Sequence, residues 1–223
     1  PHVFAHWGWG TALDWNRYHY RVVPEWKLTE ENLADLTILI VPNVEVFDPA
    51  LVSELTAWVE EGGNLIVTGP SGQRRGERGW YETMADLSLA SLTGVADYGS
   101  APEELLTAVG AGQVLFLKDT IGYDFFCATE SRPSMLSPFR DAIGRFGLGD
   151  DFPIVQDASD EPFTLGISVH HDTPERRYFI DLYNTDIDVD TDVITPTDPA
   201  SFMVRLPAWL AEEPLSVQAC TPD

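Results

Sequence analysis

A serine in a glycine-rich turn is the first candidate for chemistry. Ser71 stands in Gly69-Pro70-Ser71-Gly72, directly after an apolar run that is typical of a buried strand. A nucleophile at a strand-to-helix turn needs a histidine and an acid to activate it. No histidine follows until His170 and His171, and Pro70 removes a backbone donor from the turn. A structural loop is therefore favoured, with Ser71 as a weak candidate nucleophile. A ligand pocket at this sheet edge stays open as an alternative.

A second candidate nucleophile is Cys127, which follows the aromatic residues Tyr123, Phe125 and Phe126. Such neighbours favour a buried, unreactive thiol, and the sequence supplies no nearby base. The only other cysteine is Cys220. Two distant cysteines make neither a disulfide scaffold nor a Cys-x-x-Cys metal site, and we expect two free thiols rather than one bridge.

Three arginines, Arg74, Arg75 and Arg78, form the one basic cluster of an acidic chain. Their guanidinium groups can make forked hydrogen bonds to a carboxylate ligand or to an acidic partner surface. The alternative is a solvated loop whose arginines balance nearby acidic residues. We favour that alternative slightly, and Arg74 and Arg75 stay candidate binding residues.

Four aspartates alternate along the chain at Asp186, Asp188, Asp190 and Asp192. In a loop, three of them could ligate Ca²⁺. The EF-hand pattern fails, because threonines occupy the positions of the required glycine and of the final glutamate. A hydrated acidic segment is favoured over a metal site, and we expect no cofactor.

The first twenty residues are dense in aromatic rings, and the tryptophans are Trp7, Trp9 and Trp15. Exposed rings stack on sugar faces and also make subunit contacts. The alternative is that these rings cap the core of a short first strand and helix. An exposed row of the three tryptophans would indicate carbohydrate binding, whereas buried rings would indicate a structural role.

The charge balance narrows the classes of partner. Among 223 residues, 36 Asp and Glu oppose 13 Lys and Arg, and the formal net charge is −23. Such a surface repels phosphate backbones and anionic membrane faces, so we expect neither nucleic-acid nor membrane partners. Only Lys27 and Lys118 are lysines. This composition indicates either a salt-adapted, halophilic protein or the arginine bias of a GC-rich genome.

No apolar run approaches the roughly 20 residues of a membrane-spanning helix. The N-terminal Pro1-His2-Val3-Phe4 shows no signal peptide, so a cytoplasmic location is the default expectation. A cleaved signal, or excision from a longer chain, would leave the same sequence.

A strand–helix–strand unit is the clearest structural pattern. The run Ile38–Asn43 is typical of a strand buried on both faces. Asp48-Pro49 then predicts a helix start, an apolar stripe follows at helical spacing, and Gly62-Gly63 predicts the helix end. A second buried strand over residues 65–68 completes a βαβ unit.

The remaining elements are predicted less directly. We expect strands at 3–7, 20–24 and 113–117, a helical turn at 29–33, a short helix from Pro102 to Leu106 and a helix near Ser134. After residue 150 the pattern changes to period two, with strands expected at 163–169, 177–183, 202–206 and 215–219. The sequence thus predicts an α/β domain over residues 1–150 and a small β-rich domain over residues 151–223.

The α/β part resembles one known family. Leu39-Ile40-Val41-Pro42-Asn43, and the run from Leu55 to Gly69 with its Trp58-Val59-Glu60-Glu61-Gly62-Gly63, are similar to the β-galactosidase trimerisation domain. That domain is class I glutamine amidotransferase-like and follows the catalytic barrel of family 42 glycoside hydrolases. The resemblance implies a flavodoxin-like, three-layer sandwich with a mainly parallel sheet, followed by a small antiparallel β domain. A catalytic barrel of roughly 250 residues cannot fit in this chain.

We therefore expect a non-catalytic accessory or oligomerisation module of a glycoside hydrolase-like protein. Its partners would be further copies of itself or a catalytic domain, joined by burial of an aromatic patch. Two alternatives remain. One is a stand-alone amidotransferase-like hydrolase that uses Ser71 or Cys127, and the other is a carbohydrate-binding protein that uses the N-terminal rings.

Overall fold

The computed structural model describes residues 2–16, 18, 20–48, 50–77, 80–128 and 132–147. Beyond these it describes the strands at 154–156, 165–172, 177–184, 187–188, 193–194 and 202–204. The chain divides into two compact units. One contains residues 1–13 and 20–150, and the other contains residues 14–19 and 151–223.

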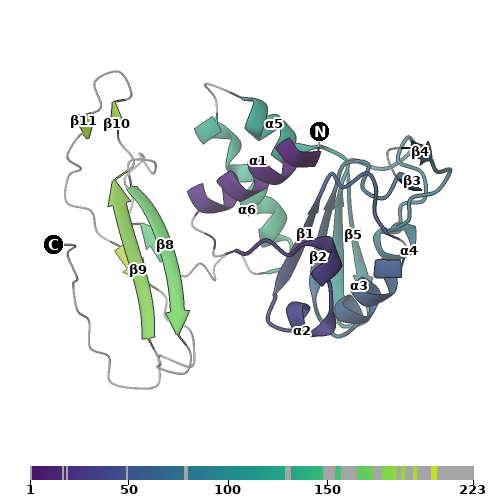
Figure 1. The fold of residues 1–223 in the computed structure, drawn as a ribbon, viewed down its shortest axis with the longest axis horizontal. Coiled ribbons are helices and arrows are strands. Elements are labelled where there is room, and N and C mark those ends of the chain that lie inside the picture. The colour runs from purple at the N-terminus through teal and green to yellow at the C-terminus, as the bar shows by residue number, and fades with distance from the viewer. Residues whose placement is uncertain are drawn as a thin grey trace. The chain divides into compact units, whose positions relative to one another are not determined.

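A four-stranded sheet forms the centre of the first unit (Figure 1). Its order is β1 (Ile38–Pro42), β2 (Asn64–Thr68), β6 (Gly112–Leu117) and β5 (Glu104–Val109). β1, β2 and β6 are parallel, and β5 pairs antiparallel with β6. β2 and β6 supply the most buried residues because they lie between the two edge strands. The predicted α/β class with a mainly parallel sheet is confirmed.

Helix α3 (Ala50–Glu60) makes the crossover from β1 to β2. It begins where the Asp48 carboxylate accepts the backbone N–H of Ala50 at 2.9 Å, as a helix cap does. It ends before Gly62, whose φ of 117° suits glycine. With α2 (Glu30–Leu33) and α4 (Ala90–Thr93), α3 contributes to a buried cluster that includes Leu33, Leu55 and Leu92.

The other face of the sheet is covered by α1 (His2–Trp15), α5 (Ile121–Cys127) and α6 (Ser137–Gly144), as Figure 1 shows. Phe139 of α6 lies between the other two helices. Its ring centroid is 4.8 Å from that of Trp9 in α1 and 5.3 Å from that of Phe125 in α5, both edge to face. The sheet is thus the middle of three layers.

Helix α1 corrects the prediction of a strand at residues 3–7. The buried positions of α1 are Ala5, Gly8, Trp9, Ala12 and Leu13, which recur at i, i+3, i+4, i+7 and i+8 and so form one helical face. Three of the five are small residues with little hydrophobic signal, and large rings occupy both faces. The helical period is therefore hidden in the sequence.

Two further expectations were wrong. Residues 20–24 form no strand, and a 3-10 helix, η1 (Glu25–Lys27), follows them. Residues 104–109 form strand β5 instead of continuing a short helix from Pro102. The residues of β5 alternate between exposed and half-buried, and pairing with β6 outweighs the helix propensity of the Glu-Glu-Leu-Leu run. The predicted helix near Ser134 is confirmed as α6, preceded by η2 (Arg132–Met135).

A hairpin of β3 (Arg74–Glu77) and β4 (Trp80–Thr83), absent from the sequence predictions, follows the serine turn. In the second unit β8 (Leu165–Asp172) pairs antiparallel with β9 (Arg177–Asn184), which confirms a β-hairpin there. Shorter pairs join β7 (Ile154–Gln156) to β12 (Phe202–Val204), and β10 (Ile187–Asp188) to β11 (Val193–Ile194). The strand expected at 215–219 lies outside the described residues.

The contact between α1 and α5 depends on two glycines. A Cβ added at Gly8 would overlap the carbonyl oxygen of Gly122, and one added at Gly122 would lie 2.5 Å from the carbonyl oxygen of Ala5. Both backbones therefore touch, with no room for a methyl group between them. This close approach determines how the side chains of the two helices meet.

We expect Gly8→Ala to lower the free energy of unfolding by about 2 kcal/mol or more, because the helices must separate. The matched control is Gly144→Ala in α6, where an added Cβ meets nothing within 4 Å. The control should be neutral or stabilising by up to about 1 kcal/mol. Urea denaturation of both variants measures the difference, and equal stabilities would contradict the described contact.

Candidate functional site

A cluster of four aromatic rings lies on the outer side of α1 and α5. The Phe4 and Phe126 rings stack with centroids 5.1 Å apart, and Trp7 lies 5.5 Å from Phe126. Tyr123 extends the group, 6.2 Å from Phe4. Phe4 is 42% exposed and Trp7 is 52% exposed. We call these four residues the aromatic cluster, and its exposed apolar surface is the candidate functional site.

Helical spacing and the glycine contact together assemble this cluster. Phe4 and Trp7 are three residues apart on α1, and Tyr123 and Phe126 are three apart on α5, so each pair shares a helix face. The ring-rich N-terminus of the sequence contains Trp7 and Phe4, but nothing in the sequence prediction linked them to Tyr123 and Phe126. The i, i+3 spacing of rings in both segments is the signal that could have found them.

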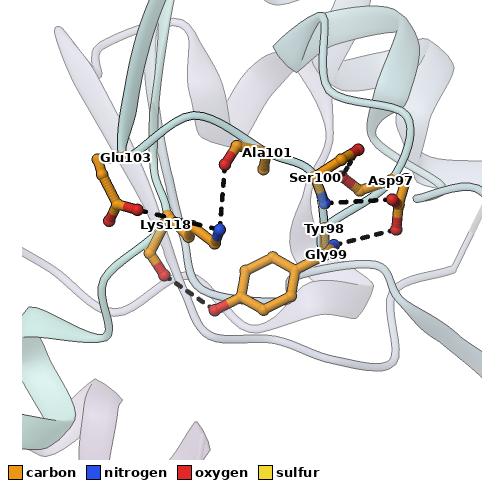
Figure 2. Close-up of polar contacts among 7 residues, drawn as sticks. All are labelled: Asp97, Tyr98, Gly99, Ser100, Ala101, Glu103 and Lys118. Carbon is orange, nitrogen blue, oxygen red and sulfur yellow. Dashed lines mark hydrogen bonds and ion pairs between the residues drawn. The ribbon is translucent and has the colours of Figure 1, made fainter.

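A polar network fixes the chain just before α5. Figure 2 shows Lys118, which follows β6, with its ammonium group 3.1 Å from the carbonyl oxygen of Ala101 and 3.9 Å from the Glu103 carboxylate. The Tyr98 hydroxyl donates to the Lys118 carbonyl at 3.0 Å. These contacts hold the end of β6 against the segment before β5. They therefore fix the start of α5, the helix that contains Tyr123 and Phe126.

In the same loop, the Asp97 carboxylate accepts the backbone N–H groups of Gly99 and Ser100 at 3.0 and 3.2 Å (Figure 2). Hydrogen bonds from the Ser100 side chain and from Gly99 lower the pKa of Asp97. Because the pKa of Asp97 is lower in the folded protein than in the unfolded chain, its ionised carboxylate stabilises the turn at any pH above the unfolded-state pKa. This stabilisation is lost as the pH falls through the folded-state pKa. Burial raises the pKa of Tyr98, so its hydroxyl stays a donor.

Cys127 lies at the end of α5 with its side chain exposed, which corrects the expectation of a buried thiol. The aromatic neighbours Tyr123 and Phe126 take the outer face of a helix, so they do not enclose the thiol. A side-chain hydrogen bond with Cys127 raises the pKa of Tyr123. Cys127 is a free thiol, while Cys220 lies outside the described residues.

Ser71 is fully buried and hydrogen-bonded to backbone groups. Its hydroxyl donates to the Thr68 carbonyl at 2.7 Å and accepts the Val44 N–H at 2.9 Å. Ser71 thereby ties the end of β2 to the segment after β1. This geometry favours the structural interpretation of the turn over the nucleophilic one.

Two buried oxygens lie close to the same sheet edge. Asn43 has a φ of 54° and is almost fully buried, and its Oδ1 has no hydrogen-bond partner among the described residues. The same holds for Oγ1 of Thr68. A Cβ at Gly69 would lie 2.8 Å from Asn43 Oδ1. The glycine is therefore needed for this tight arrangement.

The arginines of the predicted basic cluster are paired with acidic residues. Arg74 binds Glu45 at 3.0 Å, and Arg75 binds Glu82 across the β3–β4 hairpin at 3.4 Å. Arg78 lies outside the described residues. These pairs favour the interpretation in which the arginines balance local acid.

The three candidate tryptophans do not form one exposed row. Trp9 is buried against Phe139 and Gly122, with its indole nitrogen lacking a hydrogen-bond partner among the described residues. Trp15, the last residue of α1, is half-buried. Trp7 alone of the three lies in the exposed cluster.

Among the aspartates of the acidic run, Asp186, Asp190 and Asp192 lie outside the described residues, and Asp188 is described only as part of β10. Elsewhere, no group of three His, Cys, Asp or Glu residues in the described part of the chain could hold a metal ion. None of the helices described has the length and apolar character needed to cross a membrane.

Comparison with known proteins gives a family match. Residues 14–112 match the family described as the beta-galactosidase trimerisation domain. The matched range begins near the end of α1 and ends at the start of β6, so it contains β1, α3, β2 and β5 but not the aromatic cluster. No curated protein matches the sequence.

Several solved structures are similar to part of this chain. A β-galactosidase from Rahnella sp. R3 is 14% identical with a TM-score of 0.55, covering 82% of this chain and 32% of its own. The exo-beta-1,4-mannosidase Op5Man5 from Opitutaceae bacterium strain TAV5 is 14% identical, with a TM-score of 0.46 over 65% of this chain and 31% of its own.

A catalytic mutant of Gan42B, a GH42 beta-galactosidase from G. stearothermophilus, is 11% identical, with a TM-score of 0.46 over 74% of this chain and 28% of its own. The present chain thus spans about a third of the length of the solved structures that it matches.

Ser71→Ala should lower the free energy of unfolding by about 1–3 kcal/mol, because it leaves the partly buried Val44 N–H without its acceptor. Ser53→Ala is the matched control, since the Ser53 hydroxyl lies on the exposed side of α3. The control should change stability by less than about 0.5 kcal/mol. Guanidinium denaturation of both variants tests this. A stable Ser71→Ala protein that loses a hydrolytic activity would instead identify a nucleophile.

Cys127 should react with a thiol reagent in the native protein, because its side chain is exposed. A Cys220→Ser background limits the signal to Cys127, and Cys127→Ser in the same background is the blank. Ellman's reagent measures the rate, and peptide mapping locates the label. Labelling that appears only after denaturation would show that the thiol is buried.

Proposed function

We propose that this chain, in which residues 14–112 match the beta-galactosidase trimerisation domain, is a non-catalytic oligomerisation module of a glycoside hydrolase-type protein. A trimerisation domain implies a homo-oligomer, and we take the number of subunits to be three. Residues 1–150 would be the α/β domain of this module and residues 151–223 its β-rich domain. The aromatic cluster would be buried between subunits.

The observation that carries the proposal is the exposure of stacked rings on an acidic protein. Exposed apolar patches with ordered aromatic side chains are typical of protein interfaces. An aromatic side chain can bury roughly 150–250 Å². At about 25 cal/mol per Å², covering the half-exposed Phe4 and Trp7 would contribute on the order of 5 kcal/mol before the costs of association.

The net charge of −23 opposes assembly, since like-charged copies repel each other. The sequence of α1 contains no charged side chain before Asp14, apart from its histidines. The α1 side of the aromatic cluster therefore brings no acidic side chain of residues 2–13 into the contact. We further propose that the acidic surface is an adaptation to salt, which screens the repulsion between copies.

The two alternative functions have less support. A hydrolase that uses Ser71 would need an accessible hydroxyl, whereas this hydroxyl is buried and bonded to the backbone. Cys127 is exposed, but its side-chain partner is a tyrosine and not a histidine. A sugar-binding row of tryptophans is not supported, because Trp9 is buried.

The test is the mass in solution of the 223-residue chain at about 0.01 M and 1 M salt, between which the Debye length falls from about 30 Å to about 3 Å. We expect a trimer that is tighter at high salt. Trp7→Ala should weaken assembly by about tenfold or more. Circular dichroism checks that the variant stays folded.

The matched control is Leu106→Ala, which removes an exposed apolar side chain on the edge strand β5, far in sequence from the cluster. It should leave the assembly constant unchanged. A wild-type chain that is monomeric at both salt concentrations would refute the assembly function. Equal losses in the two variants would refute the role of the aromatic cluster.

A further inference from the structure

A trimer can bury the aromatic cluster in two ways. Three copies of one patch can meet around the threefold axis, or a patch away from the axis can meet a different patch on the next copy in a head-to-tail ring. This inference rests on the proposed trimer, and the second arrangement requires another apolar surface on each subunit. The family match leaves this cluster outside its range, which favours a second contact surface within residues 14–112.

All but one of the exposed large hydrophobic side chains of the described residues fall into two groups in the sequence. Among the described residues they are Val3, Phe4 and Trp7 on α1, then Tyr20, Val22 and Trp26 before α2, and finally Leu106 on β5. We call residues 20–27 the Trp26 segment. Trp26 is 81% exposed, and Val22 is 58% exposed. A tryptophan so exposed is the strongest apolar anchor on the described surface.

The Trp26 segment is held in place at both ends. The Arg21 guanidinium binds the Asp35 carboxylate and the carbonyl oxygen of Asn32. At the other end the Glu25 carboxylate accepts the backbone N–H of Asp48 at 3.0 Å. Asp35 precedes the edge strand β1 and Asp48 follows it, so the segment is attached to the chain on both sides of that strand. A surface fixed in this way binds with little loss of conformational entropy.

Charge complementarity favours a second copy as the occupant. Lys27, beside Trp26, is exposed and forms no ion pair among the described residues, unlike Lys118, which approaches Glu103. On α5, Asp124 is exposed and follows Tyr123 of the aromatic cluster. A chain with net charge −23 therefore presents an unpaired cation beside one apolar surface and an acid beside the other.

We propose that the aromatic cluster of one copy docks on the Trp26 segment of the next copy, with Lys27 facing Asp124, and that three such contacts close the ring.

A mixing experiment tests this arrangement with the whole 223-residue chain. Trp26→Ala and Trp7→Ala should each weaken trimer formation by about tenfold or more, because each removes one side of every contact. When the two variants are mixed, one intact cluster can meet one intact Trp26 segment, so 1:1 complexes should appear in analytical ultracentrifugation. If the clusters met each other instead, Trp26→Ala would assemble normally, and the proposal would be wrong.

A charge exchange tests the pairing of Lys27 with Asp124. Lys27→Glu and Asp124→Lys should each weaken assembly, and the double variant should restore it at unchanged net charge. Arg140→Glu is the control for Lys27→Glu, since Arg140 is exposed on α6 without an ion pair among the described residues. Glu54→Lys on the exposed side of α3 is the control for Asp124→Lys.

No recovery in the double variant, or equal losses in the controls, would refute the pairing. A monomeric wild-type chain would refute the proposed function itself. A wild-type trimer that is insensitive to Trp26→Ala would refute only the docking of the aromatic cluster on the Trp26 segment.

Discussion

The contact of α1 with α5 at Gly8 and Gly122 is the constraint on which the outer surface depends. With no Cβ on either residue, the two backbones touch. Trp9 then lies over Gly122 and contacts Phe139. These contacts pack the helical layer on the sheet. On the opposite side, the same proximity stacks Phe4 on Phe126. One short distance thus produces both a buried core and an exposed aromatic surface.

Polar side chains at the ends of the strands are used to join segments of backbone. Ser71 connects the chain after β1 to the end of β2, and Lys118 connects the end of β6 to the segment before β5. A hydroxyl or ammonium group committed to backbone partners is poorly placed to act on a ligand. In an α/β sheet this edge often carries chemistry, whereas here it positions the helix that supports the aromatic cluster.

An element was predicted correctly where its local sequence pattern indicates the same structure as the contacts that it makes in the fold. β1, α3 and β2 were predicted because a continuous apolar run, a capping aspartate and a terminal Gly62-Gly63 pair all indicate the same βαβ unit. Helix α1 was missed because its buried face is made of Ala5, Gly8 and Ala12, which hydrophobic periodicity does not detect. Strand β5 was missed because its identity depends on pairing with β6.

The sequence by itself determined the acidic charge, the βαβ unit, the family resemblance and the presence of many rings near the N-terminus. These follow from composition and from short-range spacing. Only the tertiary structure decided that Trp9 is buried while Trp7 is exposed, that Cys127 is exposed while Ser71 is buried, and that Phe126 joins Phe4. Each of these depends on which residues far apart in the chain come into contact, and hydrophobicity at a single position cannot encode such a contact.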